Sequence, residues 1–340
     1  MQDNETFKVT SQIKKDKWNE FIQNHPKGNI FQTPEMMEVY KRTKRYEPVF
    51  LAVVDESDNV KAMLLAHVIR EFEGLLGAFS ARSIIQGGPL YVENEEGVAA
   101  LQILTKHYDE IAKKKALYTE IRNCWDASSI SNILNDMGYV YVDVLNFLIN
   151  LNRAEEEIWR DIHKSRRKGI NRAMKKGINI EEIHDKELIP IFYRIIEETY
   201  KKAKIPLADV SLFESAFELM VPKNMAKFYL AKYGDIHIGV RVVLSYKGLI
   251  YDWYAGALTK YLSMYVNELL VWQILKDGVK NGCRMFDFGG AGKPNEPYGP
   301  REFKRRFGGQ LVNFGRYKKI HSPRKLWLAE RGFEVWRRIK

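Results

Sequence analysis

The sequence predicts an α+β protein built from two similar halves. Its 340 residues exceed the usual domain of about 100–200 residues. Helical and strand-like segments follow one another in the same order twice. The apolar triplet at 50–52 and the segment 58–63 recur about half a chain later, at 229–231 and 235–240. This spacing is typical of a duplicated domain in which helices cover mixed sheets.

In the first half, residues 17–23 have helical spacing and end at a turn over 25–28. Thr33 and Pro34 indicate a helix start, because threonine caps free N–H groups and proline suits the first helical position. Two apolar runs separated by a polar turn predict a strand hairpin. The expected elements are strands 49–54 and 60–68, a strand broken at 86–89, helix 96–114, strand 118–122, helix 129–137 and a long strand 139–151.

The second half opens with a helix that Asn152 would cap, with Glu155 at the capping-box spacing. We expect this helix to run to Gly177 with a break at Gly169. The remaining expected elements are helices 186–202 and 211–220, strands 227–232, 236–246 and 249–255, helix 265–281, strand 285–288 and a glycine-rich loop at 289–292.

Composition excludes several classes of protein. Hydrophobic residues make up 45% and charged residues 29%, as in soluble globular proteins. Two distant cysteines, Cys124 and Cys283, exclude a disulfide framework and a cysteine-rich zinc site. There is neither an apolar leader nor a run approaching the roughly 20 apolar residues that span a bilayer. We therefore expect a cytoplasmic protein.

The positive charge is concentrated in two segments. The whole chain carries +11, of which residues 160–176 supply +7 and residues 301–340 supply +10, leaving −6 for the rest. A basic run is often only a solvated helix face. Two such concentrated segments favour anionic partners such as nucleic acid, phosphates or an acidic membrane surface.

Familiar catalytic motifs are missing, and one block remains. Asp287-Phe288-Gly289 spells the kinase triplet without the other kinase motifs, and there is no P-loop or serine elbow. The scattered histidines predict no metal. The block comprises the strand 285–288, the loop 289–292 and residues 298–309. Its glycines allow close approach of a substrate, and Lys304 can pair with phosphate or stabilise an oxyanion. The simpler interpretation is a strand, a turn and a basic surface helix.

This block resembles the C-terminal signature of the Fem family, peptidyltransferases that build peptidoglycan cross-bridges from aminoacyl-tRNA. Other segments agree across nearly the whole chain: Gln32-Thr33-Pro34, Gly87-Gly88-Pro89 with Tyr91, the basic run 164–173, and Tyr254-Ala255-Gly256. The resemblance implies two acetyltransferase-like (GNAT-type) domains in tandem. We expect them at 1–151 and 152–316, with 317–340 returning to complete the first domain.

The resemblance also implies roles for particular residues. Phe303 and Lys304 match a pair whose lysine contacts the aminoacyl-tRNA end and supports the transition state. An attacking amine with a pKa of about 10.4 must first lose its proton, and Asp252 and Asp287 are candidate partners for it. The other assigned residues are Lys41, Tyr91, Tyr254, Gly289 and Gly290 for substrate and Arg166, Arg167, Lys168, Arg305 and Arg306 for tRNA. No cofactor is expected besides aminoacyl-tRNA as co-substrate.

Departures from the family pattern leave the acceptor open. Met36 stands where tryptophan is usual, the acceptor-binding lysine falls nearer Tyr40 than Lys41, and Ala208 stands where shorter members carry an arginine. There is no coiled-coil arm. A UDP-muramyl peptide, a lipid-linked precursor at the inner membrane face, or another amine remain as acceptors.

Two rival functions also remain. One is an acyl-CoA N-acyltransferase of the polysaccharide-associated kind, although the coenzyme A loop Q/R-x-x-G-x-G/A is absent from the sequence. The other is a non-catalytic module that binds RNA or, through residues 324–340, an anionic membrane.

Overall fold

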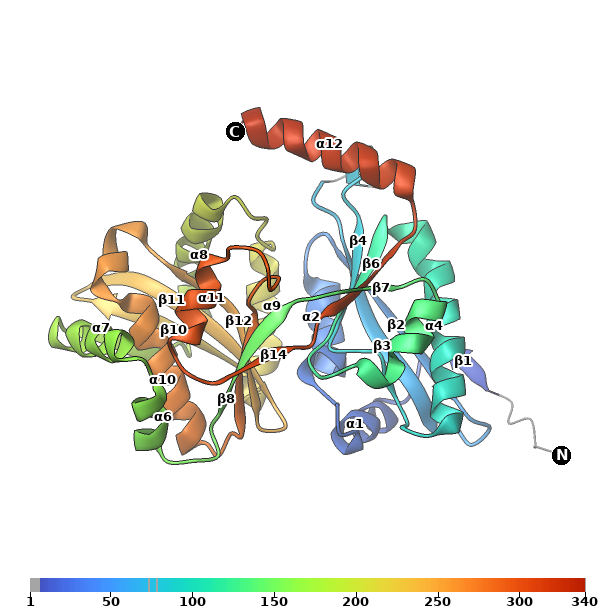
Figure 1. Ribbon diagram of the computed structural model, residues 1–340, viewed down its shortest axis with the longest axis horizontal. Helices are drawn as coiled ribbons and strands as arrows, with labels where there is room; N and C mark the ends of the chain where they lie inside the picture. Colours follow the sequence, from blue (N-terminus) through green and yellow to red (C-terminus); the bar gives the residue numbers. More distant parts are fainter. Residues whose placement is uncertain (1–6, 73, 78, 340) are drawn as a thin grey trace. The chain divides into compact units, whose positions relative to one another are not determined.

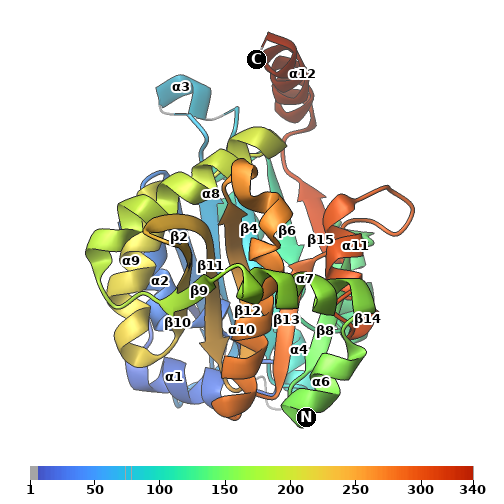
Figure 2. The ribbon, with the colours of Figure 1, turned by 90° about the vertical axis from the view of Figure 1, so that its left-hand side faces the viewer.

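The structure is a computed structural model that describes residues 7–72, 74–77 and 79–339. The chain folds into two compact units (Figures 1 and 2). Unit 1 comprises Met1–Asp143 and Phe314–Lys340, and unit 2 comprises Val144–Asn313.

Unit 1 is a mixed sheet in the order β1-β2-β3-β4-β6-β15-β7, with β5 pairing to β3. Its strands are β1 (Lys8–Thr10), β2 (Tyr46–Val54), β3 (Val60–Ile69), β4 (Arg82–Gln86), β5 (Leu90–Tyr91), β6 (Tyr118–Arg122), β7 (Val140–Val142) and β15 (Arg316–Ile320). Its helices are α1 (Lys15–Asn24), η1 (Ile30–Gln32), α2 (Pro34–Arg42), α3 (Gly74–Gly77), α4 (Glu95–Lys115), η2 (Ser128–Ile130), α5 (Ser131–Asp136) and α12 (Pro323–Ile339).

Alternation along the strands of unit 1 explains its two layers of helix. Leu51 of β2 packs with Leu101 of α4 in one apolar core. The neighbouring Phe50 points to the other face, where its ring stacks on Trp18 of α1 at 3.7 Å. Helix α2 begins as the sequence predicts, because the Thr33 hydroxyl accepts the N–H of Met36.

The two short motifs of the first half hold each other in place. The amide of Gln32 is fully buried, donates to the carbonyls of Leu65 and Gln86, and accepts the N–H of Leu65. A Cβ on Gly88 would lie 2.7 Å from this amide. The glutamine motif at 32–34 and the glycine motif at 87–89 therefore form one structural bracket in unit 1.

Unit 2 is a second mixed sheet in the order β14-β8-β13-β12-β11-β10-β9. Its strands are β8 (Leu145–Asn150), β9 (Ile178–Glu182), β10 (Ala226–Tyr233), β11 (Ile236–Tyr246), β12 (Leu249–Ala257), β13 (Met285–Gly290) and β14 (Gln310–Asn313). Its helices are α6 (Glu155–Asp161), α7 (Lys164–Lys175), η3 (Lys186–Leu188), α8 (Ile189–Ala203), α9 (Val210–Met220), η4 (Val221–Lys223), η5 (Thr259–Met264), α10 (Val266–Lys280) and α11 (Gly299–Arg305). Helices α7 and α10 pack on one face in a shared core, and Phe192 of α8 packs on Phe228 at 5.1 Å on the other.

The two sheets have the same topology, which confirms the duplicated α+β fold. Read from β1 and from β9, each sheet has three antiparallel pairings, then one parallel pairing, then two antiparallel pairings. The predicted hairpins are β2–β3 and β10–β11, at equivalent places in the two sheets.

The sixth strand of each sheet comes from the other half of the sequence. Strand β8 follows β7 in the chain but lies between β13 and β14, and β15 follows β14 but lies between β6 and β7. The expected single strand 139–151 is therefore two strands in two sheets. The units divide at 143/144 and 313/314 rather than at the expected 151/152 and 316/317.

The first helices of unit 2 also differ from expectation. Helix α6 begins at Glu155, and the backbone N–H of Asn152 instead donates to the side chain of Asn150. The break lies between α6 and α7, where the His163 ring accepts the N–H of Ser165. Gly169 stays within α7, where the absence of a Cβ lets the ring of Tyr265 pack closely against the helix.

Within the described part of the chain, the helices are too short or too polar to cross a bilayer.

Candidate active site

The predicted catalytic residues of unit 2 meet where β12 and β13 stop pairing. The parallel register ends at Tyr251 opposite Asp287, although β12 continues to Ala257 and β13 to Gly290. Strand β12 also has one extra residue: Val242 faces Tyr254 and Val243 faces Asp252, which leaves Trp253 as a β-bulge. Bulges of this kind redirect side chains and are common beside active sites.

Lys304 binds the backbone at the end of β13. It lies on α11, whose first turn contains Pro300. Its ammonium group donates to the carbonyls of Phe288 at 2.6 Å, Gly290 at 2.9 Å and Gly289 at 3.3 Å. Burial lowers the pKa of Lys304 to about 8; Asp252 and Asp287 oppose this shift, and Arg241 adds to it. The side chain is thus a half-buried cation that holds the glycine-rich loop in place.

Asp287 is the second titrating group of the site. Its carboxylate is 1% exposed and accepts the Asn146 amide and the N–H of Gly289, each at 2.6 Å. Gly289 adopts a φ of +66°, a conformation that favours glycine, so the loop can turn this N–H back to the carboxylate. Burial raises the pKa of Asp287 to about 6, although both hydrogen bonds and Lys304 favour the charged form.

Asp252 is held by a residue that sequence reasoning missed. Arg241 of β11 donates through Nε and Nη2 to the two carboxylate oxygens of Asp252 at 2.8 and 2.9 Å. Both side chains are buried. Because both oxygens are occupied, Asp287 is better placed than Asp252 to accept a proton. The signal for Arg241 was an arginine inside the apolar run 238–244.

Phe303 and Arg166 form a packed pair beside the lysine. The Phe303 ring lies 5.2 Å from that of Phe307. The Arg166 guanidinium lies over the Phe303 ring, 4.5 Å from its centre. Arg166 also donates to the buried carboxylate of Glu268. Its head group is therefore turned toward its own unit, whereas Lys168 on the same helix is exposed.

The other basic residues assigned to tRNA lie on α7 and at the end of α11. Arg167 is half-buried on α7. Arg305 and Arg306 both pair with Glu302, at 2.7 and 2.6 Å. Arg305 is well exposed, and its charge is available at the surface of unit 2.

The residues assigned to substrate binding are divided between the units. Lys41 is exposed on α2 of unit 1 and pairs with Glu38 at 2.8 Å, and Tyr91 is buried on β5 of the same unit. Tyr254 on β12 packs against Phe213 with ring centres 4.9 Å apart. The structure thus brings Lys304, Asp252, Asp287, Gly289 and Gly290 together in unit 2 and places Lys41 and Tyr91 elsewhere.

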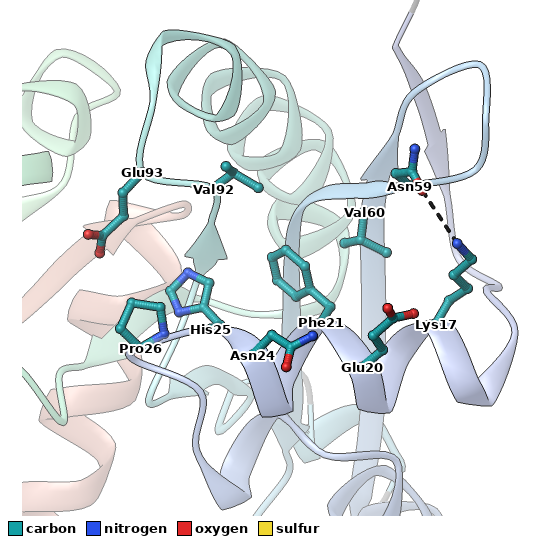
Figure 3. A pocket seen from close by; sticks show the side chains of 10 residues that line it. All are labelled: Lys17, Glu20, Phe21, Asn24, His25, Pro26, Asn59, Val60, Val92 and Glu93. Atoms are coloured by element: carbon teal, nitrogen blue, oxygen red, sulfur yellow. Dashed lines mark hydrogen bonds between the residues drawn. The ribbon is translucent and has the colours of Figure 1, made fainter.

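A cavity of about 370 Å³ lies in unit 1 (Figure 3). Phe21, Val60 and Val92 line it, with Glu93 and His25 at one side. The His25 ring bonds the Tyr91 carbonyl at 2.7 Å and accepts the N–H of Lys27 at 3.0 Å, so the backbone engages both nitrogens. This arrangement suits a structural histidine better than a catalytic base.

Comparison with known proteins agrees with the fold described above. Residues 164–305 match the family described as acetyltransferase (GNAT) domain. No curated protein sequence matches the chain. The crystal structure of FemX is similar with a TM-score of 0.70 and 16% identity, over 94% of this chain and 99% of that one.

Two further solved structures share the architecture. L-PGS from Bacillus licheniformis has a TM-score of 0.57 and 13% identity over 93% of this chain and 96% of that one. A tandem GNAT protein from the clavulanic acid biosynthesis pathway has a TM-score of 0.57 and 10% identity over 94% and 99%.

The fold and the family match define a tandem GNAT protein whose second unit carries an acyltransferase domain. Its fold is shared with FemX, as the sequence motifs predicted. The match of residues 164–305 to an acetyltransferase domain indicates an acyltransferase.

Proposed function

We propose that this protein transfers an amino acid from aminoacyl-tRNA to an amine of a peptidoglycan precursor, either a lipid-linked or a nucleotide-linked muramyl peptide. The observation that carries the proposal is the half-buried Lys304, held at the end of β13, with the buried Asp287 acting on its charge. The likeness to the structures of FemX and L-PGS supports the same class of reaction.

The chemistry needs a base and a positive charge. In aminoacyl transfer the amine nitrogen bonds to the ester carbonyl carbon, and the bond to the tRNA ribose oxygen breaks. Asp287, with a pKa of about 6, is largely ionised at pH 7 and can accept the amine proton. Lys304 places a positive charge near the oxygen that becomes negative. The proton then goes to the departing ribose oxygen, and no covalent enzyme intermediate is required.

The donor distinguishes this proposal from an acyl-CoA transferase. In this chain the segment between β12 and α10 is the short helix η5, and Tyr265 precedes α10 with a φ of +62°. Residues 258–266 contain no glycine. Glycine-rich turns before a helix are what normally cradle a pyrophosphate, so this segment favours tRNA over coenzyme A.

Partners and location follow from the acceptor. A lipid-linked precursor would bring the protein to the inner face of the cytoplasmic membrane, and a nucleotide-linked one would leave it in the cytoplasm. The exposed charges at Lys168 and Arg305, with the half-buried Arg306, are where we expect tRNA phosphates to bind.

The test is transfer of radiolabelled amino acids from charged tRNAs to cell-wall precursors. Lys304→Ala should reduce transfer roughly 100-fold or more, because the positive charge at the end of β13 is lost. Lys293→Ala is the matched control, since Lys293 lies in the loop between β13 and α11, is exposed and pairs with Glu296. Acetyl transfer from acetyl-CoA without any response to charged tRNA would establish the acyl-CoA alternative instead.

A further inference from the structure

Exposed large apolar side chains gather at one end of the unit 1 sheet. Single apolar residues on a surface are ordinary, but a group of them in one place marks an interaction site. Phe72 and Phe79 belong to the β3–β4 loop and are 48% and 42% exposed. Ile320, the last residue of β15, is 46% exposed. Trp327 and Leu328 of α12 are each 53% exposed. Together these five side chains form the α12 surface.

The strand register places these segments at the same end of the sheet. Ile69, which ends β3, lies opposite Arg82, which begins β4. Strand β4 runs parallel to β6, and Tyr118 at the start of β6 pairs with Ile320. Since only β6 separates β4 from β15, the β3–β4 loop and α12 leave the sheet about 10 Å apart. Figure 2 shows α3 of this loop and α12 beyond the same end of the sheet.

The outer face of α12 combines apolar and basic side chains. Among the described side chains of α12, Leu326 is the buried one, at 8% exposure. An exposed stripe follows the i, i+3, i+4, i+7 spacing: Arg324, Trp327, Leu328 and Arg331. At 3.6 residues per turn, this stripe lies mainly on the side opposite Leu326. The Arg331 guanidinium lies over the Trp327 ring, 4.5 Å from its centre.

Further positive charge surrounds the α12 surface. Exposed basic residues come from the turn before β2, the end of α4 and the start of α12: Lys44, Arg45, Lys114 and Lys325. Arg45 donates to the carbonyl of Glu71 at 3.0 Å, which links this turn to the β3–β4 loop. The carboxylate of Glu71 pairs with Arg82 at 2.6 Å, and that of Glu47 pairs with Arg70 at 2.9 Å. These two acids are therefore engaged by other arginines and leave the exposed charges in place.

The combination of side chains favours a membrane over a nucleic acid. RNA phosphates would be held by the basic residues alone, and aliphatic side chains such as Ile320 and Leu328 would gain nothing from them. A bilayer with anionic lipids suits both kinds of residue. Lysine and arginine attract its headgroups, while tryptophan and apolar side chains enter the boundary between headgroups and acyl chains.

We propose that the α12 surface docks unit 1 on an anionic lipid bilayer. Trp327 and Leu328 of α12 enter the boundary below the headgroups, and so do Phe72 and Phe79 of the β3–β4 loop. The basic residues around them bind headgroup phosphates. This docking is independent of the transfer reaction. Its consequence, that the acceptor is the lipid-linked precursor, rests on the proposed function.

The experiment is co-sedimentation of the full chain with lipid vesicles in the absence of substrate. Vesicles of equimolar phosphatidylglycerol and phosphatidylcholine should bind the protein roughly tenfold or more tightly than vesicles of phosphatidylcholine alone. Trp327→Ser combined with Leu328→Ser should weaken binding to the anionic vesicles roughly tenfold, because the apolar anchors are lost. Arg324→Gln combined with Arg331→Gln should weaken it by a similar factor and reduce its salt dependence.

A second double variant tests the loop, and matched controls come from unit 2. Phe72→Ser combined with Phe79→Ser should also weaken vesicle binding several-fold, although α12 is unaltered. Ile236→Ser removes an apolar side chain that is 50% exposed at the start of β11. Lys186→Gln combined with Lys201→Gln removes two exposed charges. Neither control should change vesicle binding.

The possible outcomes separate docking from the alternatives. Vesicle binding that survives the apolar double variants, or that the controls weaken equally, would overturn the proposal. Failure of the unaltered protein to bind vesicles would overturn it too, and loss of tRNA binding in the same variants would then assign the surface to nucleic acid. Vesicle binding without transfer from any charged tRNA would support docking and refute the proposed reaction. Transfer without vesicle binding would refute docking and leave the reaction standing.

Discussion

Asp287 carries a charge that burial disfavours, and the surrounding residues only partly compensate for it. Asn146 and the Gly289 N–H both donate to one oxygen, and Lys304 supplies a positive charge nearby. The pKa nevertheless remains above its ordinary value of 3.8, at about 6. A site that raises the pKa of a carboxyl group toward pH 7 is a candidate for proton transfer. It also affects stability in a way that can be measured.

We predict that the contribution of Asp287 to stability falls as pH rises from about 4 to 6. In this window the unfolded chain loses the Asp287 proton before the folded chain does. The stabilising contribution of Asp287 that is present below pH 4 is therefore lost, and the loss amounts to about 3 kcal/mol. Asp287→Asn keeps an oxygen acceptor but cannot ionise, so this decline should be smaller. Urea unfolding at pH 4.5 and pH 7 measures it. Asp235→Asn, at a fully exposed position, is the control; an unchanged decline in Asp287→Asn would contradict the prediction.

A substitution at Gly88 tests whether the glutamine motif at 32–34 and the glycine motif at 87–89 hold each other in place in unit 1. The Gln32 side chain is held by three hydrogen bonds and lies where a Cβ on Gly88 would go, so Gly88→Ala must displace it. We predict a loss of about 2–4 kcal/mol in the free energy of unfolding. Gly332→Ala is the matched control: it lies in α12 with nothing within 4 Å, and should be neutral or stabilise the helix by up to about 1 kcal/mol. Equal effects of the two substitutions would refute the bracket.

At the scale of elements, helix α7 carries basic residues of two kinds: Arg166 has a structural role, and Lys168 is a surface cation. Arg166 covers Phe303 and pairs with the buried Glu268, whereas Lys168 is exposed. We predict that Lys168→Glu weakens tRNA binding about tenfold at low salt and reduces the salt dependence by about one ion, with no change in stability. Arg166→Met should instead cost about 3–5 kcal/mol in stability, because it leaves the Glu268 carboxylate unpaired.

Filter binding across a salt series and thermal unfolding measure the two effects. Lys201→Glu, an exposed substitution on α8 of the same unit, is the control for general charge. If it weakens tRNA binding as much as Lys168→Glu does, α7 has no special role.

Sequence patterns predicted the elements whose partners are close in the chain. The hairpins β2–β3 and β10–β11, and the helix that Thr33 caps, depend on local turns and caps, so apolar alternation and turn residues were sufficient. Lys304, Asp287 and the glycine loop could be predicted because they form one contiguous block. Arg241 could not be placed, because its role depends on the bulge at Trp253 and on a cross-strand register that no local pattern encodes.

The exchange of strands could not be predicted either, because an uninterrupted apolar run does not reveal which sheet receives it. Residues 139–151 read as one strand, yet β7 pairs with β15 in unit 1 and β8 pairs with β13 and β14 in unit 2. At the scale of the whole molecule, each half of the sequence thus supplies the sixth strand of the other half's sheet. Neither half of the sequence alone contains a complete sheet.

This exchange predicts that unit 1 depends on the C-terminal segment through β15 rather than through α12. Strand β15 pairs with β6 and β7, its Tyr317 is 1% exposed in the core, and its Lys319 pairs with Asp109 at 2.6 Å. A chain ended after Asn313 should lose the cooperative unfolding of unit 1. A chain ended after Ser322 keeps β15. In the part of α12 whose side chains are described, Leu326 is the buried apolar residue, so this chain should lose only about 2 kcal/mol.

Calorimetry and limited proteolysis distinguish the two truncations. Unit 2 keeps every strand of its sheet in both chains, so a protease-resistant fragment near 144–313 should survive in each. In the chain ended after Asn313, residues 7–143 should be digested rapidly, because β7 has lost its pairing with β15 and Asp109 has lost its lysine. Protection of that region without β15 would show that the strand only adds to a sheet that is already stable. Digestion of residues 7–143 in both truncated chains would show that unit 1 depends on α12 rather than on β15.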